Sequence, residues 1–222
     1  MIKTDYLSIH ENQYKHFRNT GRKGWNDEKS IKLVLDIVLE TIKKNNLPKS
    51  IKILELGCGD AELSLSLADL GYYVSGIDIS PTAIEWAKEK ATERDMKSDF
   101  RVGDVLSMEY DDNSFDIAVD SYCLHCIIGR DREKFLKEIK RILKPDGLLI
   151  GITMSNTIPE DIKQYFNENR EMVRNGVAGR YIGRSDDILK EFKNSGYELL
   201  YNSVEVIDKE ADDLKYVCRK IK

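Results

Sequence analysis

Short apolar segments and helical stripes alternate along the first two thirds of the chain. Segments typical of short, largely buried strands lie at residues 50–56, 72–78, 98–104, 114–127 and 148–154. Between them, apolar side chains recur at helical spacing, at residues 28–46, 61–71, 80–95 and 131–143. Strands that alternate with helices through short links predict an α/β fold with a doubly wound parallel sheet and helices on both faces.

The last third of the chain has a different pattern. Residues 156–184 are polar, and we expect them to be helical in parts, with breaks at Asn175-Gly176 and Gly179. A capped helix is predicted at 185–196. The segments 197–207 and 214–221, joined by an acidic loop, predict an antiparallel hairpin at the edge of the sheet.

The composition narrows the class of protein. The chain has 222 residues, 41% of them hydrophobic, which is enough for a single domain with one core. Its net charge is −4, whereas proteins that bind duplexes are usually basic, so we expect no nucleic-acid partner. No signal peptide is visible, and no segment approaches the ~20 apolar residues of a membrane helix. With only four cysteines, we expect a cytoplasmic protein with reduced thiols, monomeric or homodimeric, without a membrane partner.

The sequence ILELGCGDAE, residues 53–62, is a glycine-rich turn between a predicted strand and a predicted helix. A triphosphate-binding loop needs Lys followed by Ser or Thr after its glycines, and Asp60 stands here instead. A dinucleotide-binding loop needs a third glycine where this chain has Glu62. The acids Glu55, Asp60 and Glu62 would also repel a pyrophosphate.

S-adenosylmethionine (SAM) suits the same residues better, because it carries a sulfonium cation and an ammonium group but no phosphate. Gly57 and Gly59 allow the backbone to approach its amino-acid end closely. Glu55 at the start of the loop suits the ammonium group. Asp78, at the end of the second strand, can accept hydrogen bonds from both ribose hydroxyls, and Asp104 can accept one from the adenine amino group.

These residues, together with the LKPDG turn at 143–147, resemble the class I SAM-dependent methyltransferases of the small-molecule type, over about residues 30–154. The resemblance implies a mostly parallel seven-stranded sheet whose last strand is antiparallel. It implies SAM as cofactor, with S-adenosylhomocysteine as product. The cofactor residues that it implies are Trp25, Glu55, Gly57, Cys58, Gly59, Asp60, Asp78, Ile79, Asp104, Val105, Asp120 and Ser121.

The resemblance also suggests how the single domain is divided. We expect residues 1–48 to form an N-terminal helical cap and residues 49–155 the SAM-binding core. Residues 156–184 are where this family usually builds a lid over the acceptor, and residues 185–222 complete the chain as a helix and a hairpin.

The methyl acceptor is less well defined than the cofactor. Residues 120–124 lack the prolines that family members acting on amide or nucleobase amino groups often carry there. His125 is the candidate general base, since its ordinary pKa lies near neutrality, and Tyr122 is the other candidate catalytic side chain. Arg180 and Tyr181 are candidates for binding an anionic or aromatic acceptor. Packing roles for Tyr122 and His125, and a solvated role for the 180–181 pair, are the alternatives.

The sequence CLHC at 123–126 suggests zinc or redox chemistry, but a zinc site usually needs a second pair of ligands, and we expect no metal. Cys58 and the two CLHC thiols could instead bind a soft acceptor. We therefore predict methyl transfer from SAM to a small molecule. The alternatives are methylation of RNA or protein, and a non-catalytic SAM- or metal-binding protein that uses Cys123, His125 and Cys126.

Overall fold

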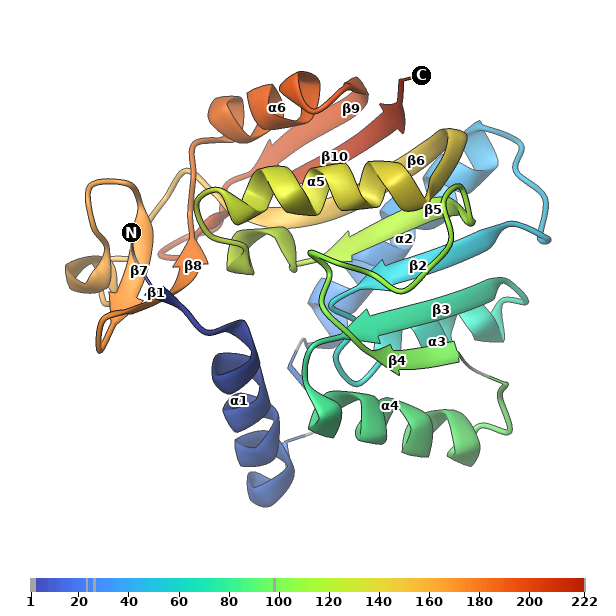
Figure 1. Cartoon of the computed structure of the whole chain (residues 1–222), viewed down its shortest axis with the longest axis horizontal. Coiled ribbons are helices and arrows are strands. Elements are labelled where there is room, and N and C mark those ends of the chain that lie inside the picture. The colour runs from blue at the N-terminus through green and yellow to red at the C-terminus, as the bar shows by residue number, and fades with distance from the viewer. Residues whose placement is uncertain (1–2, 23, 26, 98, 222) are drawn as a thin grey trace.

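A seven-stranded sheet runs through the computed structural model in the order β4-β3-β2-β5-β6-β10-β9 (Figure 1). The structure describes residues 3–22, 24–25, 27–97 and 99–221. The strands of the sheet are β2 (Lys52–Leu56), β3 (Tyr73–Asp78), β4 (Asp99–Val102), β5 (Phe115–Ser121), β6 (Leu143–Ser155), β9 (Tyr197–Glu205) and β10 (Asp212–Lys220).

Five strands of this sheet, from β4 to β6, are parallel, and β10 pairs with β6 in the antiparallel direction. The strands β9 and β10 form the predicted hairpin. The predicted fold class is therefore confirmed. The strand order reverses between β2 and β5, since the chain continues from β2 to β3 on one side and returns to β5 on the other.

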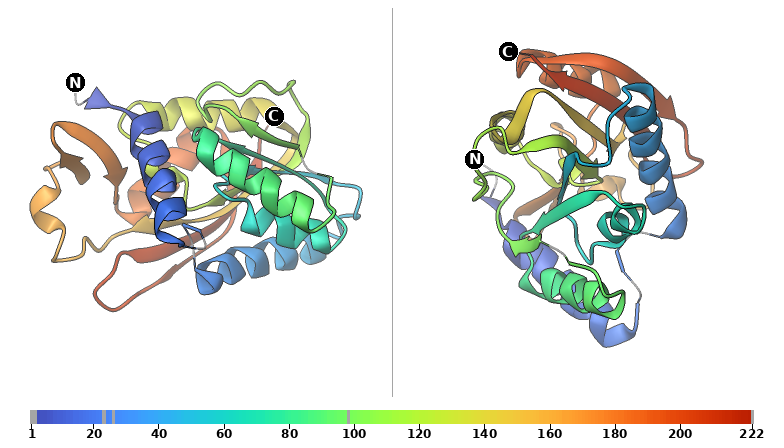
Figure 2. Two further views of the ribbon diagram at one scale, coloured as in Figure 1. Left: turned by 90° about the horizontal axis from the view of Figure 1, so that it is seen from below. Right: turned by 90° about the vertical axis from the view of Figure 1, so that its right-hand side faces the viewer.

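Helices cover both faces of the sheet (Figure 2). On one face lie α2 (Glu28–Lys44) and α3 (Glu62–Asp69), and α4 (Pro81–Glu93) packs beside α3. On the other face lie α5 (Asp131–Ile142) and α6 (Ser185–Asn194). Ser80 caps α4, since its hydroxyl accepts a hydrogen bond from Ala83 N–H at 3.1 Å. In contrast, the cap of α6 comes from a distant residue, because Asn156 Oδ1 accepts from Ser185 N–H at 2.8 Å.

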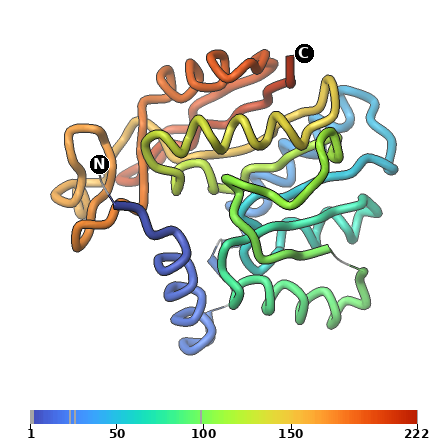
Figure 3. Tube along the Cα trace, in the orientation of Figure 1, coloured from blue at the N-terminus to red at the C-terminus, as the bar shows by residue number. Residues whose placement is uncertain are grey.

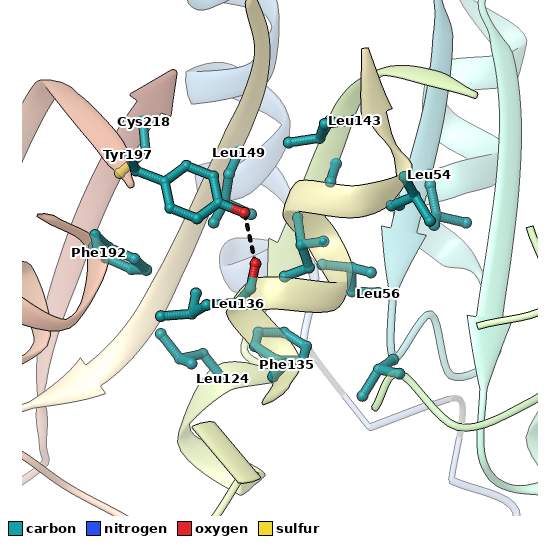
Figure 4. Close-up of a cluster of buried hydrophobic side chains, with 14 of the residues drawn as sticks. Leu54, Leu56, Leu124, Phe135, Leu136, Leu143, Leu149, Phe192, Tyr197 and Cys218 are labelled. Atoms are coloured by element: carbon teal, nitrogen blue, oxygen red, sulfur yellow. Dashed lines mark hydrogen bonds between the residues drawn. The ribbon is translucent and has the colours of Figure 1, made fainter. Parts of the chain in front are cut away.

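The two faces of each strand feed two separate apolar cores, as the alternation of side chains in a strand requires. Ile53 packs toward α2 and α3, whereas its neighbour Leu54 packs toward α5. Tyr197 closes the core beneath α5 and α6, where its hydroxyl donates to the carbonyl oxygen of Leu136 at 2.9 Å (Figure 4). Both faces of the sheet are buried, so its carboxyl-terminal edge is left to bind ligands.

The helix α1 (Tyr6–Thr20) lies outside the two helical layers, beside the start of α4. The carboxylate of Glu11 accepts hydrogen bonds from the Ser80 and Thr82 hydroxyls, at 2.6 and 2.7 Å, and from Thr82 N–H. Burial alone would raise the pKa of Glu11, but these hydrogen bonds outweigh it and lower the pKa to about 2. An ionised carboxylate at the amino end of α4 therefore fixes α1 beside the edge of the sheet.

Residues 156–184 form a small sheet, so the prediction that they are helical in parts was largely wrong. The strand β7 (Glu171–Arg174) pairs with β8 (Val177–Tyr181), and β8 pairs with β1 (Lys3–Thr4) near the N-terminus (Figure 3). The described helical structure here is one short 3₁₀ turn, η2 (Lys163–Tyr165). Asn175 and Gly176 have φ angles of 50° and 76°, the two left-handed residues of a tight hairpin turn. The Asn-Gly pair joins two strands and does not break a helix.

Among the described residues, none of the helices combines the length and the apolar character that crossing a bilayer requires.

Candidate cofactor and acceptor site

A cavity opens where the carboxyl ends of the parallel strands meet, at the point where the strand order reverses. Ligands of doubly wound sheets bind at this position. The cavity encloses about 800 Å³ of space, part of it open to solvent. Most of the predicted site residues line it: Trp25, Gly57, Cys58, Asp60, Asp78, Ile79, Asp104, Val105, Ser121, Tyr122 and His125.

The glycine-rich turn places the bare backbone of Gly57 at the cavity, whereas the predicted Gly59 is buried and absent from the cavity wall. Gly57 and Gly59 have φ angles of 62° and 55°, in the left-handed region that favours glycine. A Cβ added to Gly57 would lie 2.9 Å from Cys123 Sγ, and a Cβ on Gly59 would lie 2.1 Å from Tyr14 Oη. Both positions therefore need glycine for two reasons, the backbone conformation and the close approach of a neighbouring side chain.

Asp78 lies at the end of β3 and joins the glycine turn to the start of α4. Its two carboxylate oxygens accept hydrogen bonds from Gly59 N–H at 2.9 Å and Ser80 N–H at 2.8 Å. Its side chain is almost fully buried, and burial raises its pKa to about 6 although both backbone donors oppose the shift. Each carboxylate oxygen can accept more than one hydrogen bond, so Asp78 keeps acceptor capacity toward the cavity that it lines.

Glu55 does not line the cavity, although sequence reasoning assigned it to the ammonium group. It lies inside β2, where its carboxylate accepts from Ser64 N–H at 3.0 Å and from the Ser64 hydroxyl at 2.5 Å. Burial raises its pKa to about 8. Glu55 therefore connects β2 to α3 behind the turn. Asp60 is the acid of this turn that reaches the cavity, and it forms an ion pair with Lys90 at 2.6 Å.

The far wall of the cavity consists of Ile79, Asp104 and Val105, which follow β3 and β4. The carboxylate of Asp104 accepts a hydrogen bond from Leu106 N–H at 2.8 Å, and this bond fixes the turn after β4. A flat apolar surface from Ile79 and Val105 beside a carboxylate can bind an aromatic ring that carries an amino group.

Asp120 supports the turn after β5 from behind and is absent from the cavity wall. Its carboxylate is fully buried and accepts from Cys123 N–H at 2.6 Å, from Leu124 N–H at 3.0 Å and from the Tyr216 hydroxyl. Burial raises its pKa to about 6. Its neighbour Ser121 does line the cavity, so only one of these two predicted residues can contact a ligand there.

Tyr122 and His125 line both this cavity and a wider groove beside it, which extends to the loop between β9 and β10. Tyr122 has a φ of 61°, unusual for a tyrosine, and its hydroxyl donates to Asp213 Oδ2 at 2.7 Å. His125 lies in η1 (Leu124–Cys126), is almost fully buried, and its Nδ1 has no hydrogen-bond partner among the described residues. Burial, with Arg180, lowers the pKa of His125 well below its usual range. A neutral imidazole therefore faces the groove.

The N-terminal helix contributes an aromatic wall that sequence reasoning missed. Tyr6, His10 and Tyr14 of α1 line the cavity beside the predicted Trp25. The ring centroids of His10 and Tyr14 both lie 5.5 Å from that of Trp25. The spacing of four residues between these three side chains was the available signal, since it places them on one face of a helix.

The side chains of Arg180 and Tyr181 lie in different surroundings. Arg180 lines two hollows that adjoin the cavity at the strand ends, here called the cofactor cavity. His125 also lines the first hollow, and His10 also lines the second. Tyr181 instead packs against the apolar core, and the guanidinium of Arg132 lies 4.4 Å from its ring centroid. Tyr181 lines neither hollow. The pair expected to bind the acceptor is therefore divided, and only Arg180 is open to a ligand there.

The cysteines are free thiols, with Cys58 and Cys126 buried and Cys123 partly buried. Burial raises the pKa of Cys126 to about 12 and the pKa values of Cys58 and Cys123 well above their usual range. In the part of the chain that the structure describes, no group of three or more His, Cys, Asp or Glu side chains is arranged to hold a metal ion. Cys58 packs among apolar residues of α3 and α4 and lies against Gly76.

The charges of the cavity fit SAM. Its described lining contains three aspartates and no lysine or arginine. Gly57 leaves backbone exposed at one end, and an apolar surface beside Asp104 lies at the other. Such a wall attracts a cation that carries hydroxyl and amino donors, and it repels a pyrophosphate.

Comparisons with known proteins agree with this chemistry. A family model described as a methyltransferase domain matches residues 54–151. A demethylmenaquinone methyltransferase from Listeria monocytogenes serotype 4a is 31% identical over 160 residues, 70% of this chain. An eEF1A lysine and N-terminal methyltransferase from Bos taurus is 34% identical over 102 residues, 46% of this chain. The chain spans 66% of the length of the first relative and 15% of the second.

A solved structure shares the fold at greater coverage. The 1,6-didemethyltoxoflavin-N1-methyltransferase of Burkholderia thailandensis, crystallised with 1,6-didemethyltoxoflavin and S-adenosylhomocysteine, aligns with a TM-score of 0.75 and 16% identity. The alignment covers 97% of this chain and 88% of that one, so it includes α1 and the small sheet as well as the main sheet.

Proposed function

Because this chain belongs to the class I SAM-dependent methyltransferases, we propose that it transfers the methyl group of SAM to a small-molecule acceptor held beside His125. The observation that carries this proposal is the charge of the cavity at the strand ends. Three aspartates and no lysine or arginine line its described wall, which suits a sulfonium cofactor. When bound, SAM supplies a methyl group on a positively charged sulfur, which is a good leaving group.

The assignment of the cofactor residues follows from the chemistry of each position. Gly57 receives the amino-acid end of SAM, with Asp60 as the acid of the turn that lines the cavity, while Gly59 donates its N–H to Asp78. Asp78 accepts hydrogen bonds from the ribose hydroxyls, and Asp104 accepts one from the adenine amino group. Glu55 and Asp120 lie behind the cavity wall. Glu55 accepts a hydrogen bond from Ser64 N–H, and Asp120 accepts from the N–H groups of Cys123 and Leu124.

The surroundings of the acceptor favour a small molecule over a chain. The cofactor cavity adjoins its two neighbouring hollows at Trp25, and α1, η1 and residues 156–184 surround this junction. We propose that residues 156–184, as the small sheet and the loop before it, act as the lid over the acceptor.

The catalytic side chains act by positioning more than by proton abstraction. The pKa of His125 lies well below its usual range, so its imidazole is neutral and a weak base. Tyr122 is held by its hydrogen bond to Asp213, and burial raises its pKa, so it is no source of phenolate. We therefore expect His125 to align a nucleophile that needs no strong base.

The affinity for SAM is expected to fall at acid pH. Asp78 accepts hydrogen bonds best when it is ionised, and its pKa in the free protein is about 6. Below that pH a bound cofactor must expel a proton, so the affinity should decrease by about tenfold for each further pH unit. Calorimetric titration with S-adenosylhomocysteine between pH 5 and pH 8 measures this slope. In the Asp78→Asn variant, the slope should disappear. A slope unchanged by this substitution would assign the proton to another group.

The acceptor class can be tested with labelled SAM. The protein is incubated separately with small molecules, with RNA and with protein from cells of the source organism. We expect label in the small-molecule fraction, and a loss of at least roughly tenfold in the Asp78→Ala variant. Label confined to RNA or to protein would contradict the proposal, and the similarity to a methyltransferase of eEF1A makes the protein fraction the informative competitor.

A further inference from the structure

Of the two hollows that adjoin the cofactor cavity, the one that His10 lines has the opposite charge to that cavity. It lies between α1 and the small sheet and has a volume of about 880 Å³, part of it open to solvent. Arg174 and Arg180 line it, and its described wall contains no aspartate or glutamate. The cofactor cavity, with which it shares His10, Trp25 and Cys126, has three aspartates and no arginine. Since the whole chain carries a net charge of −4, a local excess of cations at this place points to an anion.

Arg180 is the cation that a ligand here would meet. Its Nε is buried without a hydrogen-bond partner, and its guanidinium forms no ion pair within the described ranges. Arg174 is exposed, and its guanidinium carbon lies 4.3 Å from the ring centroid of Tyr165. Two further arginines nearby have polar partners. Arg132 pairs with Glu191 at 2.7 Å, and Arg170 donates to the carbonyl oxygens of Asn156 and Ile182. Burial removes water from a guanidinium, and this costs free energy. Hydrogen bonds to a bound anion would compensate for that cost.

Neutral side chains and apolar walls surround this guanidinium. Burial lowers the pKa of His10 to about 4, and His125 is also neutral. Ile162, Met172 and Val177 provide the apolar part of the wall. Acidic residues do occur on the other side of Arg180, in the wider groove toward the β9–β10 loop. None of those described carboxylates lies within ion-pair distance of Arg180, and they would exclude an anion from that side.

From this arrangement we propose that the hollow between α1 and the small sheet is the acceptor site, and that the acceptor is an organic acid. Its apolar body lies against Trp25 and the small sheet, and its anionic group pairs with Arg180. Its nucleophile extends past Trp25 and Cys126, which line both spaces, into the cavity at the strand ends that His125 lines. This proposal rests on the proposed methyltransferase function and adds the substrate class. A planar guanidinium can bind a carboxylate through two parallel hydrogen bonds.

The test separates acids from other metabolites before the reaction. Small molecules from cells of the source organism are divided by anion exchange into an anionic and a non-anionic fraction, and each is incubated with the protein and labelled SAM. We expect label in the anionic fraction. In the Arg180→Met variant this label should fall at least roughly tenfold, with partial recovery in Arg180→Lys. The control variant Arg130→Met loses an exposed charge at the start of α5 and should keep the label.

Each outcome distinguishes the two proposals. Binding of S-adenosylhomocysteine, measured by calorimetry, should be unchanged in Arg180→Met, which shows that the variant is folded and that its cofactor cavity is intact. Label only in the non-anionic fraction overturns the acid acceptor and leaves the proposed function standing. If the Arg180→Met variant labels the anionic fraction as strongly as the native protein does, the role of Arg180 is overturned. Label in neither small-molecule fraction contradicts the proposed function itself.

Discussion

Replacing Asp78 with alanine should weaken the binding of S-adenosylhomocysteine by roughly 30- to 1,000-fold, or about 2–4 kcal/mol. Two losses add. The ribose hydroxyls lose a charged acceptor, and the N–H groups of Gly59 and Ser80 lose the carboxylate that fixes them. An acid that only contacted the ligand would contribute the first loss alone, so the expected effect is larger than that of a simple surface contact.

Two variants make the measurement specific. Asp78→Asn keeps the shape and one acceptor oxygen, and should lie between the native protein and Asp78→Ala. Asp99→Ala removes an acid at the opposite end of the sheet, where Asp99 pairs with Arg101, and should leave the dissociation constant unchanged. If the alanine variant at position 78 bound with native affinity, the assignment of the ribose site would be wrong.

Replacing Gly59 with alanine should lower the free energy of unfolding by about 2–4 kcal/mol and weaken cofactor binding at least roughly tenfold. The new Cβ would lie 2.1 Å from Tyr14 Oη in a backbone conformation with φ of 55°. Tyr14 is buried on α1, so the clash must move either the glycine turn or the helix. Denaturant unfolding and calorimetric titration measure the two effects.

Gly71→Ala is the matched control for this substitution. Gly71 has a φ of 85°, but an added Cβ there meets nothing within 4 Å. It should therefore show only the backbone cost, about 1–2 kcal/mol. The double variant Gly59→Ala with Tyr14→Phe removes the clashing hydroxyl and leaves the ring Cζ at 3.2 Å, so it should recover part of the loss. A Gly59→Ala variant no less stable than Gly71→Ala would show that α1 does not press on the turn.

The sequence predicted the main sheet well, because the elements that form it carry local signals. Strands β2 to β6 follow short apolar runs, and the helix after Ser80-Pro81 begins where the cap and the proline indicate. Residues 156–184 were predicted less well. Their polar composition hid a hairpin whose strands pair with each other and with residues 3–4, and pairing with a distant segment leaves no periodic signal in either one.

The sequence alone determined that a glycine turn and a row of acids stand at the ends of neighbouring parallel strands, since spacing and periodicity settle where strands end. Only the tertiary structure decided which of these acids line the cavity. The carboxylate of Glu55 accepts a hydrogen bond from the Ser64 hydroxyl, while Asp78 and Asp104 line the cavity. It also decided that α1 brings Tyr14 against a turn more than 40 residues away and leaves Arg180 without a carboxylate partner in the described chain. The physical reason is that side-chain direction and burial depend on contacts between distant segments, which no local pattern records.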